Sequence, residues 1–323
     1  MNQKADLPYI VEKTNELQTA ITSIFVGKPY HLRILLIGFF SGLHVLIEDI
    51  PGVGKTTLAR SLASASGLDM GRIQFTPDLL PGDITGMTVW NQEKREFQFK
   101  PGGVMHQFIL ADEINRASAR TQSALLEAMQ EHSVTVDGVS YPLPSPFFVI
   151  ATQNPISFAG TFVLPEGQMD RFGISFSIGY PDSSDEVTIL DRFQEQDSSE
   201  GTAVLPPSVM TAQDILKIRE TVKKIRVDKK IKKYLTELAT ATRKSSAVRL
   251  GMSPRATLHL MSAAQANAVL EERDFVIPED VANVAHSVLR HRILLTAGAR
   301  MESKTTDDVI SDILSRVPKP TGL

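Results

Sequence analysis

Apolar residues along the chain gather either in short continuous runs or at helical spacing. Runs rich in β-forming residues predict five strands, at residues 43–48, 72–75, 107–112, 147–151 and 173–178. Helical spacing, such as that of Leu58 and Leu62, occurs between these runs and in a leading segment from Ile10 to Phe25. This succession of strands and helices predicts an α/β domain.

Two further segments alternate apolar and polar residues on either side of a short turn. One pairs Met87–Trp90 with Glu96–Phe99, and the other spans residues 133–141 around Asp137 and Gly138. An Asp-Gly pair between alternating arms is typical of a tight β-turn. Each segment therefore predicts a β-hairpin.

The last third of the chain has helical spacing throughout. Its apolar faces lie near 211–225, 228–243, 254–271 and 278–291. Thr211, Ser253 and Pro278 are residues that suit helix starts. A polar stretch and a proline pair within residues 196–207 precede these helices and predict a domain boundary.

Composition narrows the setting of the protein. The 323 residues suit two domains, which we place at 1–202 and 203–323. The chain has 34 Lys and Arg against 37 Asp and Glu, so its overall charge does not favour nucleic acid. The absence of cysteine excludes disulfides and thiolate metal sites and indicates a reducing compartment. The start lacks the apolar core of a signal peptide, and the longest apolar run, Ile34–Phe40, is too short to span a bilayer. We expect a soluble cytoplasmic protein.

The strand at 43–48 leads into a glycine-bearing loop and then a helix. The loop and the first helical turn read Pro51-Gly52-Val53-Gly54-Lys55-Thr56-Thr57. The two glycines let backbone N–H groups point at an anion, and the helix N-terminus adds partial positive charge. Lys55 can then reach the β- and γ-phosphates, and Thr56 can offer its hydroxyl to Mg²⁺. A chance glycine turn is the alternative, but the strand before it and the helix after it favour a nucleotide-binding P-loop.

Asp49 departs from the usual P-loop pattern, which has a glycine at this position. A carboxylate beside a triphosphate is unfavourable unless its side chain turns away. We expect it to turn away, in which case Asp49→Gly should change the ATP affinity only a few-fold.

Two other strands end in polar residues suited to phosphoryl transfer. The strand at 107–112 ends in Asp112 and Glu113: the first can hold Mg²⁺ through water, and the second can orient and polarise the attacking water. The next strand is followed by Asn154, which could contact the γ-phosphate or the attacking water. The acidic start of a loop and an Asn-Pro turn are the structural alternatives for these residues.

The ordered motifs resemble the MoxR family of AAA+ ATPases, in the group with a helix-2 insert and a hairpin before sensor 1. The resemblance covers about Ile10 to Arg292. The motifs that carry it are Val26-Gly27, Pro51-Gly52-Val53-Gly54-Lys55-Thr56, Asp112-Glu113-Ile114-Asn115-Arg116-Ala117, Gln122-Ser123-Ala124-Leu125-Leu126-Glu127-Ala128-Met129-Gln130-Glu131, Ala151-Thr152-Gln153-Asn154-Pro155, Asp170-Arg171-Phe172, Gly251-Met252-Ser253-Pro254-Arg255 and Val288-Leu289-Arg290-His291-Arg292.

The resemblance implies a five-stranded parallel sheet flanked by helices, followed by an all-α lid domain. Residues 79–103 would form the helix-2 insert, and residues 133–143 would form the hairpin before sensor 1. Val26 and Gly27 would lie against the adenine of ATP, and Asn154 would be sensor 1.

Two arginines gain roles from the resemblance. Arg171 would be the arginine finger that completes a neighbour's site, which requires a ring, expected to be a hexamer. Arg255 would be sensor 2, and we expect it to serve its own subunit. An internal ion pair between Asp170 and Arg171 is the structural alternative for the finger, and Arg116 is the next candidate for a cation that acts on a neighbour.

We therefore expect an ATPase that uses ATP and Mg²⁺ to remodel, assemble or mature a client protein. MoxR proteins act in this way on partners with a von Willebrand factor A domain. One alternative is a nucleic-acid motor of the same AAA+ group, and the lysine run at residues 223–233 could then hold DNA, although such a run is usually a solvated face. The other alternative is the motor subunit of a metal chelatase, which shares these motifs.

Overall fold

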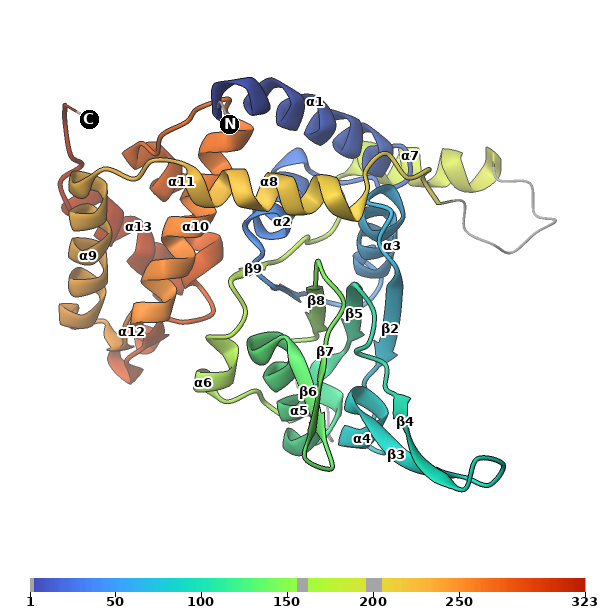
Figure 1. Ribbon diagram of the computed structural model, residues 1–323. Coiled ribbons are helices and arrows are strands. Elements are labelled where there is room, and N and C mark those ends of the chain that lie inside the picture. The colour runs from blue at the N-terminus through green and yellow to red at the C-terminus, as the bar shows by residue number, and fades with distance from the viewer. Residues whose placement is uncertain (1–2, 156–161, 196–204, 323) are drawn as a thin grey trace.

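Five parallel strands form the central sheet, in the order β2-β5-β8-β1-β9. The computed structural model describes residues 3–155, 162–195 and 205–322 (Figure 1). The strands are β1 (Val45–Glu48), β2 (Met70–Gln74), β5 (Phe108–Asp112), β8 (Phe148–Gln153) and β9 (Ile174–Phe176). The predicted α/β fold with a five-stranded parallel sheet is confirmed, and β1 lies between β8 and β9.

Alternate residues of each strand face opposite layers. Val45 and Ile47 belong to a core shared with α1 (Gln3–Thr22), α2 (Pro29–Ser41) and α3 (Lys55–Ala65). Leu46, on the other face, belongs to a second core with residues of α5 (Ala119–Glu131). Because both faces are covered, the inner strands β1, β5 and β8 are apolar up to their carboxyl ends, whereas the outer strand β2 alternates buried with exposed residues.

The predicted hairpins also form. One consists of β3 (Gly86–Asn91) and β4 (Glu96–Pro101), preceded by a short helix, α4 (Pro81–Thr85). The other consists of β6 (Ser133–Val136) and β7 (Val139–Pro142). Phe99 of the first stacks on Tyr141 of the second, with ring centroids 3.9 Å apart, so the two hairpins extend together below the sheet in Figure 1.

Helices make up most of residues 205–322, which we call the lid domain. They are α8 (Ala212–Lys224), α9 (Lys229–Lys244), α10 (Pro254–Leu270), α11 (Pro278–Leu289), α12 (Ala297–Met301) and α13 (Thr306–Arg316). Thr211 and Ser253 cap α8 and α10 as expected, each accepting a hydrogen bond from a backbone N–H of the first turn. One short antiparallel pair, β10 (Val248–Leu250) with β11 (Leu294–Leu295), interrupts the helices, so this region is not helical throughout.

The lid domain packs beside the sheet and shares the core of α1 and α2. In Figure 1 it lies to the left of the sheet, and α8 runs beneath α1 from beside α3 towards α9. Between β8 and α8 come two further helices, α6 (Glu166–Met169) and α7 (Ser183–Glu195). The predicted domain boundary at residues 202 and 203 lies outside the described residues.

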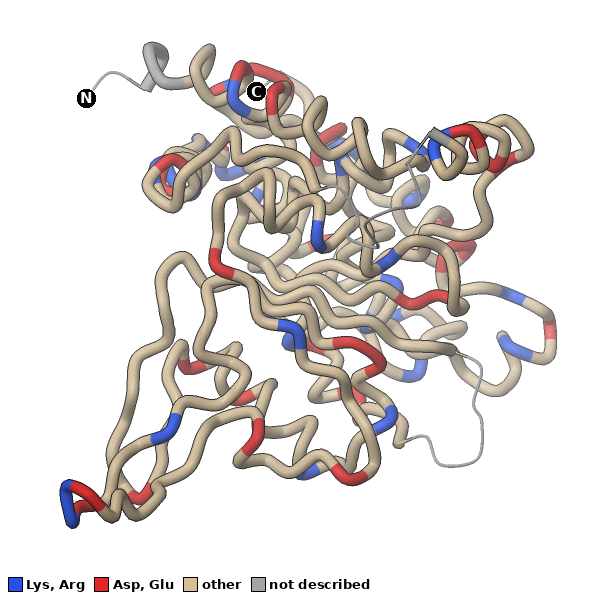
Figure 2. The backbone as a smooth tube through the Cα atoms, turned by 90° about the vertical axis from the view of Figure 1, so that its right-hand side faces the viewer, with Lys and Arg blue, Asp and Glu red and all other residues tan. Residues whose placement is uncertain are grey.

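Charged residues of both signs are interspersed over the molecule (Figure 2). In the lysine run, Lys233 pairs with Glu237 at 3.6 Å, and Lys230 Nζ donates to the carbonyl oxygens of Thr321 and Gly322. These contacts fit the interpretation of this run as a solvated helical face. Among the described residues, each helix is too short or too polar to cross a bilayer.

Candidate nucleotide-binding site

The glycine loop lies between β1 and α3, where the sequence places it. Gly52 and Gly54 adopt left-handed backbone conformations, with φ of 86° and 84°. A side chain would strain both positions, so the loop depends on glycine here. Gly54 is also the N-cap of α3, whose first residue is Lys55, and the loop therefore presents N–H groups together with a helix N-terminus.

Lys55 folds back onto the loop that precedes it. Its Nζ donates to the carbonyl oxygens of Asp49 at 2.6 Å and Ile50 at 2.8 Å. Burial lowers the pKa of this ammonium from its usual value, because desolvation disfavours the charged form. An incoming anion would relieve this cost, so Lys55 is suited to exchange the two carbonyls for phosphate oxygens.

Asp49 points away from the loop, as expected. Its Oδ2 accepts hydrogen bonds from Ile178 N at 2.6 Å, Gly179 N at 2.7 Å and Ser177 Oγ at 3.0 Å. Its Oδ1 accepts from Ile50 N at 2.8 Å. The carboxylate is thus satisfied by donors of the segment after β9 rather than left beside the phosphates.

Asp112 and Glu113 are held by a residue that the sequence analysis missed. Thr152 of β8 donates its hydroxyl to Asp112 Oδ1 at 2.6 Å and accepts from Glu113 N at 2.8 Å. Glu113, the residue after β5, has a left-handed φ of 56°. One signal in the sequence could have predicted this role: Thr152 is a polar residue at the end of an otherwise apolar strand, two residues before Asn154.

Cations and amides surround the two carboxylates. Arg72 Nη2 lies 2.8 Å from Asp112 Oδ2, and Arg116 Nη1 lies 2.9 Å from Glu113 Oε2. Gln74 Nε2 donates to Glu113 Oε2 at 3.4 Å. Arg116 therefore contacts the water-orienting candidate of its own chain, which makes it a weaker candidate for action on a neighbour.

Asn154 lies at the same edge of the sheet as the glycine loop. Gln153, immediately before it, pairs with Glu48 of β1, and its carbonyl oxygen accepts from Asp49 N at 3.0 Å. The Asn154 carbonyl accepts from Asn115 Nδ2 at 2.9 Å. The structure therefore brings Lys55, Thr56, Asp112, Glu113 and Asn154 to the carboxyl ends of β1, β5 and β8, where open α/β sheets bind ligands.

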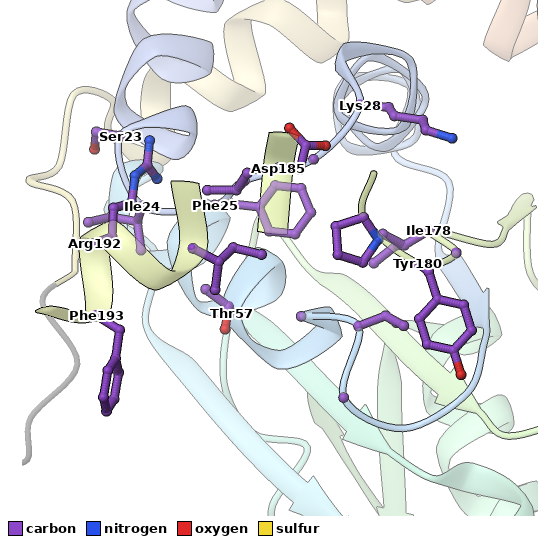
Figure 3. Close-up of a pocket in the computed structure, with 18 residues that line it drawn as sticks. Ser23, Ile24, Phe25, Lys28, Thr57, Ile178, Tyr180, Asp185, Arg192 and Phe193 are labelled. Carbon is purple, nitrogen blue, oxygen red and sulfur yellow. The ribbon is translucent and has the colours of Figure 1, made fainter. Parts of the chain in front are cut away.

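A pocket of about 660 Å³ adjoins the glycine loop (Figure 3). Its lining includes the predicted residues Val26, Gly27, Gly52, Val53, Gly54 and Thr57, and also Ile24, Phe25, Ile178 and Tyr180. Ile178 and Tyr180 lie on one side in Figure 3, and Ile24 and Arg192 on the other. A mostly apolar pocket next to a phosphate-binding loop has the character of a base-binding site.

The predicted metal ligands have suitable chemistry for Mg²⁺. Thr56 and Asp112 supply a hydroxyl and a carboxylate, both hard oxygen donors. Within the described ranges, no group of three or more His, Asp or Glu side chains is placed to hold a metal ion. Mg²⁺ commonly takes one or two carboxylates and completes its coordination with water and substrate phosphates, so the two residues fit it.

Arg171 and Arg255 lie at the opposite edge of the sheet, at the amino ends of the strands. Gly173 N donates to His44 O, just before β1, whereas the glycine loop follows the end of the same strand. The extended chain from His44 to Ile50 spans roughly 20 Å. Arg255 lies near this edge too, because its Nη2 is 3.5 Å from Gln130 of α5 and Ser253, two residues before it, bonds Asp170. In this conformation neither arginine reaches its own phosphate loop, which does not favour the expectation that Arg255 serves its own subunit.

Comparison with known proteins identifies two family regions. Residues 44–174 match the model of the ATPase family associated with various cellular activities. Residues 240–313 match the model of the AAA lid domain. The first region contains the glycine loop, Asp112, Glu113, Asn154 and Arg171, and the second contains Arg255.

Two relatives and one solved structure are similar over most of their length. The uncharacterized protein YeaC of Bacillus subtilis is 45% identical over 93% of this chain and 92% of its own. The Mycobacterium tuberculosis protein named Chaperone MoxR1 is 40% identical over 93% of this chain and 80% of its own. A crystal structure of a putative ATPase from Cytophaga hutchinsonii is 38% identical, covers 98% of both chains and superimposes with a TM-score of 0.89.

Proposed function

Because this chain belongs to the MoxR family of AAA+ ATPases, we propose that it hydrolyses ATP with Mg²⁺ and uses the energy to remodel, assemble or mature a client protein. The observation that carries this proposal is that Asp112 and Glu113, both bonded to Thr152, lie at the same ends of the strands as the loop with Lys55. A phosphate loop opposite two oriented carboxylates is the arrangement that phosphoryl transfer requires.

The side chains divide the work. The N–H groups of the loop and Lys55 bind the phosphates, and the adjoining pocket takes the base. Thr56 and Asp112 would hold Mg²⁺, which neutralises charge on the β- and γ-phosphates when bound. Glu113 orients the attacking water and accepts its proton, and Asn154 contacts the γ-phosphate or that water.

The position of Arg171 supports a ring of identical subunits, which we propose to be a hexamer. The chain presents its phosphate loop at one sheet edge and Arg171 with Arg255 at the other. A head-to-tail contact that closes on itself would bring the second edge of one subunit to the first edge of the next. We propose that both arginines act on the neighbour's γ-phosphate, where fixed cations stabilise the developing charge.

The client is proposed from the family alone, as a protein with a von Willebrand factor A domain, and the chain itself is proposed to be cytoplasmic. Nucleic acid is not favoured, because the charges of both signs are interspersed and the lysine run has its own contacts. DNA binding measured against salt concentration tests this point, since a nucleic-acid motor should bind with a steep salt dependence.

Two variants test the proposed reaction. Lys55→Ala should lose ATP binding, because it removes the cation that contacts the phosphates. Glu113→Gln should keep ATP binding and lose turnover, because its role concerns the water rather than the nucleotide. Binding by titration calorimetry and hydrolysis by phosphate release separate these effects. A wild-type chain without Mg²⁺-dependent ATP hydrolysis, or an equal loss of nucleotide affinity in both variants, would contradict the proposal.

A further inference from the structure

We propose that Asp49 is a positioning residue that fixes one wall of the base pocket and thereby strengthens binding of the nucleoside part of the ligand. The wall is the segment Ser177–Pro181, which we call the base-side turn. This inference rests on the proposed function, since it assumes a nucleotide in the pocket. It replaces the expectation that Asp49 has little influence on ATP affinity.

The geometry of Asp49 joins two parts of the site. The residue is 5% exposed, and both of its carboxylate oxygens are hydrogen-bonded. One oxygen accepts from Ile50 N, at the start of the phosphate loop, and the other accepts three donors of the base-side turn. Hydrogen bonds to a carboxylate are stronger than those between neutral groups, so this contact fixes the distance between the two segments.

The sheet does not hold the base-side turn by itself. Pairing between β1 and β9 ends at Ile47 and Phe176, and the strand expected over residues 173–178 stops there. Beyond this point Asp49 joins the segment that follows β1 to the segment that follows β9. Gly179 has a left-handed φ of 73°, and the consecutive N–H groups of Ile178 and Gly179 converge on the same oxygen. Such a concave pair of N–H groups binds an anion well, and here the chain supplies the anion itself.

The base-side turn forms part of the pocket wall. Ile178, Gly179, Tyr180 and Pro181 all line the pocket. In Figure 3, Ile178 and Tyr180 lie opposite Ile24 and Arg192. The phosphate-binding groups, by contrast, are fixed by the glycines of the loop and by α3. Loss of the Asp49 contact should therefore disturb the base side of the site more than the phosphate side.

The backbone at this position does not require glycine. Asp49 is not among the residues with left-handed φ, so removal of its side chain relieves no strain. The carboxylate at a position where phosphate loops usually have glycine is accordingly explained by its hydrogen bonds and not by the turn itself.

The test compares binding of ATP with binding of tripolyphosphate, which has the phosphates without a base. Asp49→Asn should weaken ATP about tenfold and leave tripolyphosphate within about twofold, because an amide oxygen with its NH₂ group cannot accept all four donors. Ser177→Ala removes only one of three donors to Oδ2 at an exposed serine, so it should fold normally and weaken ATP about twofold to threefold, again without effect on tripolyphosphate.

Ser184→Ala is the matched control. Ser184 is exposed, donates to the Asp182 carboxylate and, like Asp182, does not line the pocket. Its replacement should change the affinity for neither ATP nor tripolyphosphate. Equal losses for ATP and tripolyphosphate in Asp49→Asn would overturn the proposal, as would unchanged ATP affinity in both Asp49→Asn and Ser177→Ala. Tighter tripolyphosphate binding would show instead that Asp49 repels phosphate. If the wild-type chain bound tripolyphosphate as tightly as ATP, the assignment of the pocket to the base would be wrong, and the assignment of the loop to the phosphates would remain. Failure to bind either ligand would reject the proposed function.

Discussion

Arg292 of the lid domain is the ion-pair partner of Asp170. Its Nε lies 3.1 Å from Asp170 Oδ1, and its side chain is 2% exposed. Ser253, also of the lid domain, donates to both carboxylate oxygens. Within the described part of the chain Arg171 forms no such pair with Asp170. The internal ion pair between Asp170 and Arg171, which was the structural alternative to an arginine finger, is therefore not formed. The segment that carries Arg171 is anchored to the lid of its own subunit.

Breaking this anchor should destabilise the fold. Arg292→Ala leaves the Asp170 carboxylate partly buried without its cation, and we expect the free energy of unfolding to fall by about 3 kcal/mol. The neighbouring pair of Arg249 with Glu166 also joins the lid to the α/β domain, but both side chains are more than half exposed. Arg249→Ala should therefore cost no more than about 0.5 kcal/mol. Urea unfolding of both variants measures the difference, and comparable losses would contradict the structural role of Arg292.

Mixed rings should show that Arg171 acts on a neighbour. Arg171→Ala alone should bind ATP and hydrolyse it at least about a thousandfold more slowly. Lys55→Ala alone should be inactive but keeps an intact Arg171. In an equal mixture with random assembly, about a quarter of interfaces combine a complete phosphate loop with an intact finger, and ATPase activity should return in about that proportion if the sites act independently.

The same experiment decides the side on which Arg255 acts. Its place beside Arg171 predicts that a mixture of Arg255→Ala and Lys55→Ala also regains activity. A mixture that stays inactive, while the Arg171→Ala mixture recovers, would mean that the lid moves to bring Arg255 to its own nucleotide. If the Arg171→Ala mixture stayed inactive despite forming mixed rings, Arg116 would be the next residue to test.

Thr152 should affect turnover rather than binding. Thr152→Val removes the hydroxyl that holds the Asp112 carboxylate and the Glu113 backbone, and we expect kcat to fall by about tenfold or more because both residues lose their fixed position. ATP affinity should change only a few-fold, since the phosphate loop is untouched. Thr152→Ser restores the hydroxyl and should restore most of kcat. A loss that Thr152→Ser does not relieve would point to packing instead.

Acid should destabilise the protein partly through His44. Its Nδ1 accepts from Val149 N at 3.1 Å, and its Nε2 lies 3.3 Å from Met129 O, so the neutral ring satisfies both contacts. Complete burial lowers its pKa from 6.5 to about 3. The unfolded chain therefore binds more protons, and the stability due to the neutral ring, present above pH 6.5, falls as the pH drops towards 3.

Between pH 7 and pH 5 this histidine should cost about 2 kcal/mol of unfolding free energy. His44→Asn has no ring to protonate, so its stability should fall less over the same interval by about that amount. Urea unfolding of both proteins at the two pH values makes the comparison. An identical pH dependence would show that His44 is not responsible.

Local patterns in the sequence determined the elements and the phosphate-binding loop. The apolar run before Gly52, the glycines themselves and the capping residues Thr211 and Ser253 act through contacts within a few residues, so their effect is readable from neighbouring positions. The hairpin around Asp137 and Gly138 formed for the same reason. Resemblance of the ordered motifs then supplied the family.

Only the tertiary structure decided which distant residues meet. Asp49 lies 129 residues before Ile178, Asp112 lies 40 before Thr152, and Asp170 lies 122 before Arg292. A carboxylate can satisfy its hydrogen bonds with many kinds of donor, so its residue type does not reveal which one it takes. The strand order brings these partners together, because parallel neighbours such as β1, β8 and β9 are joined by long connections rather than by adjacent residues.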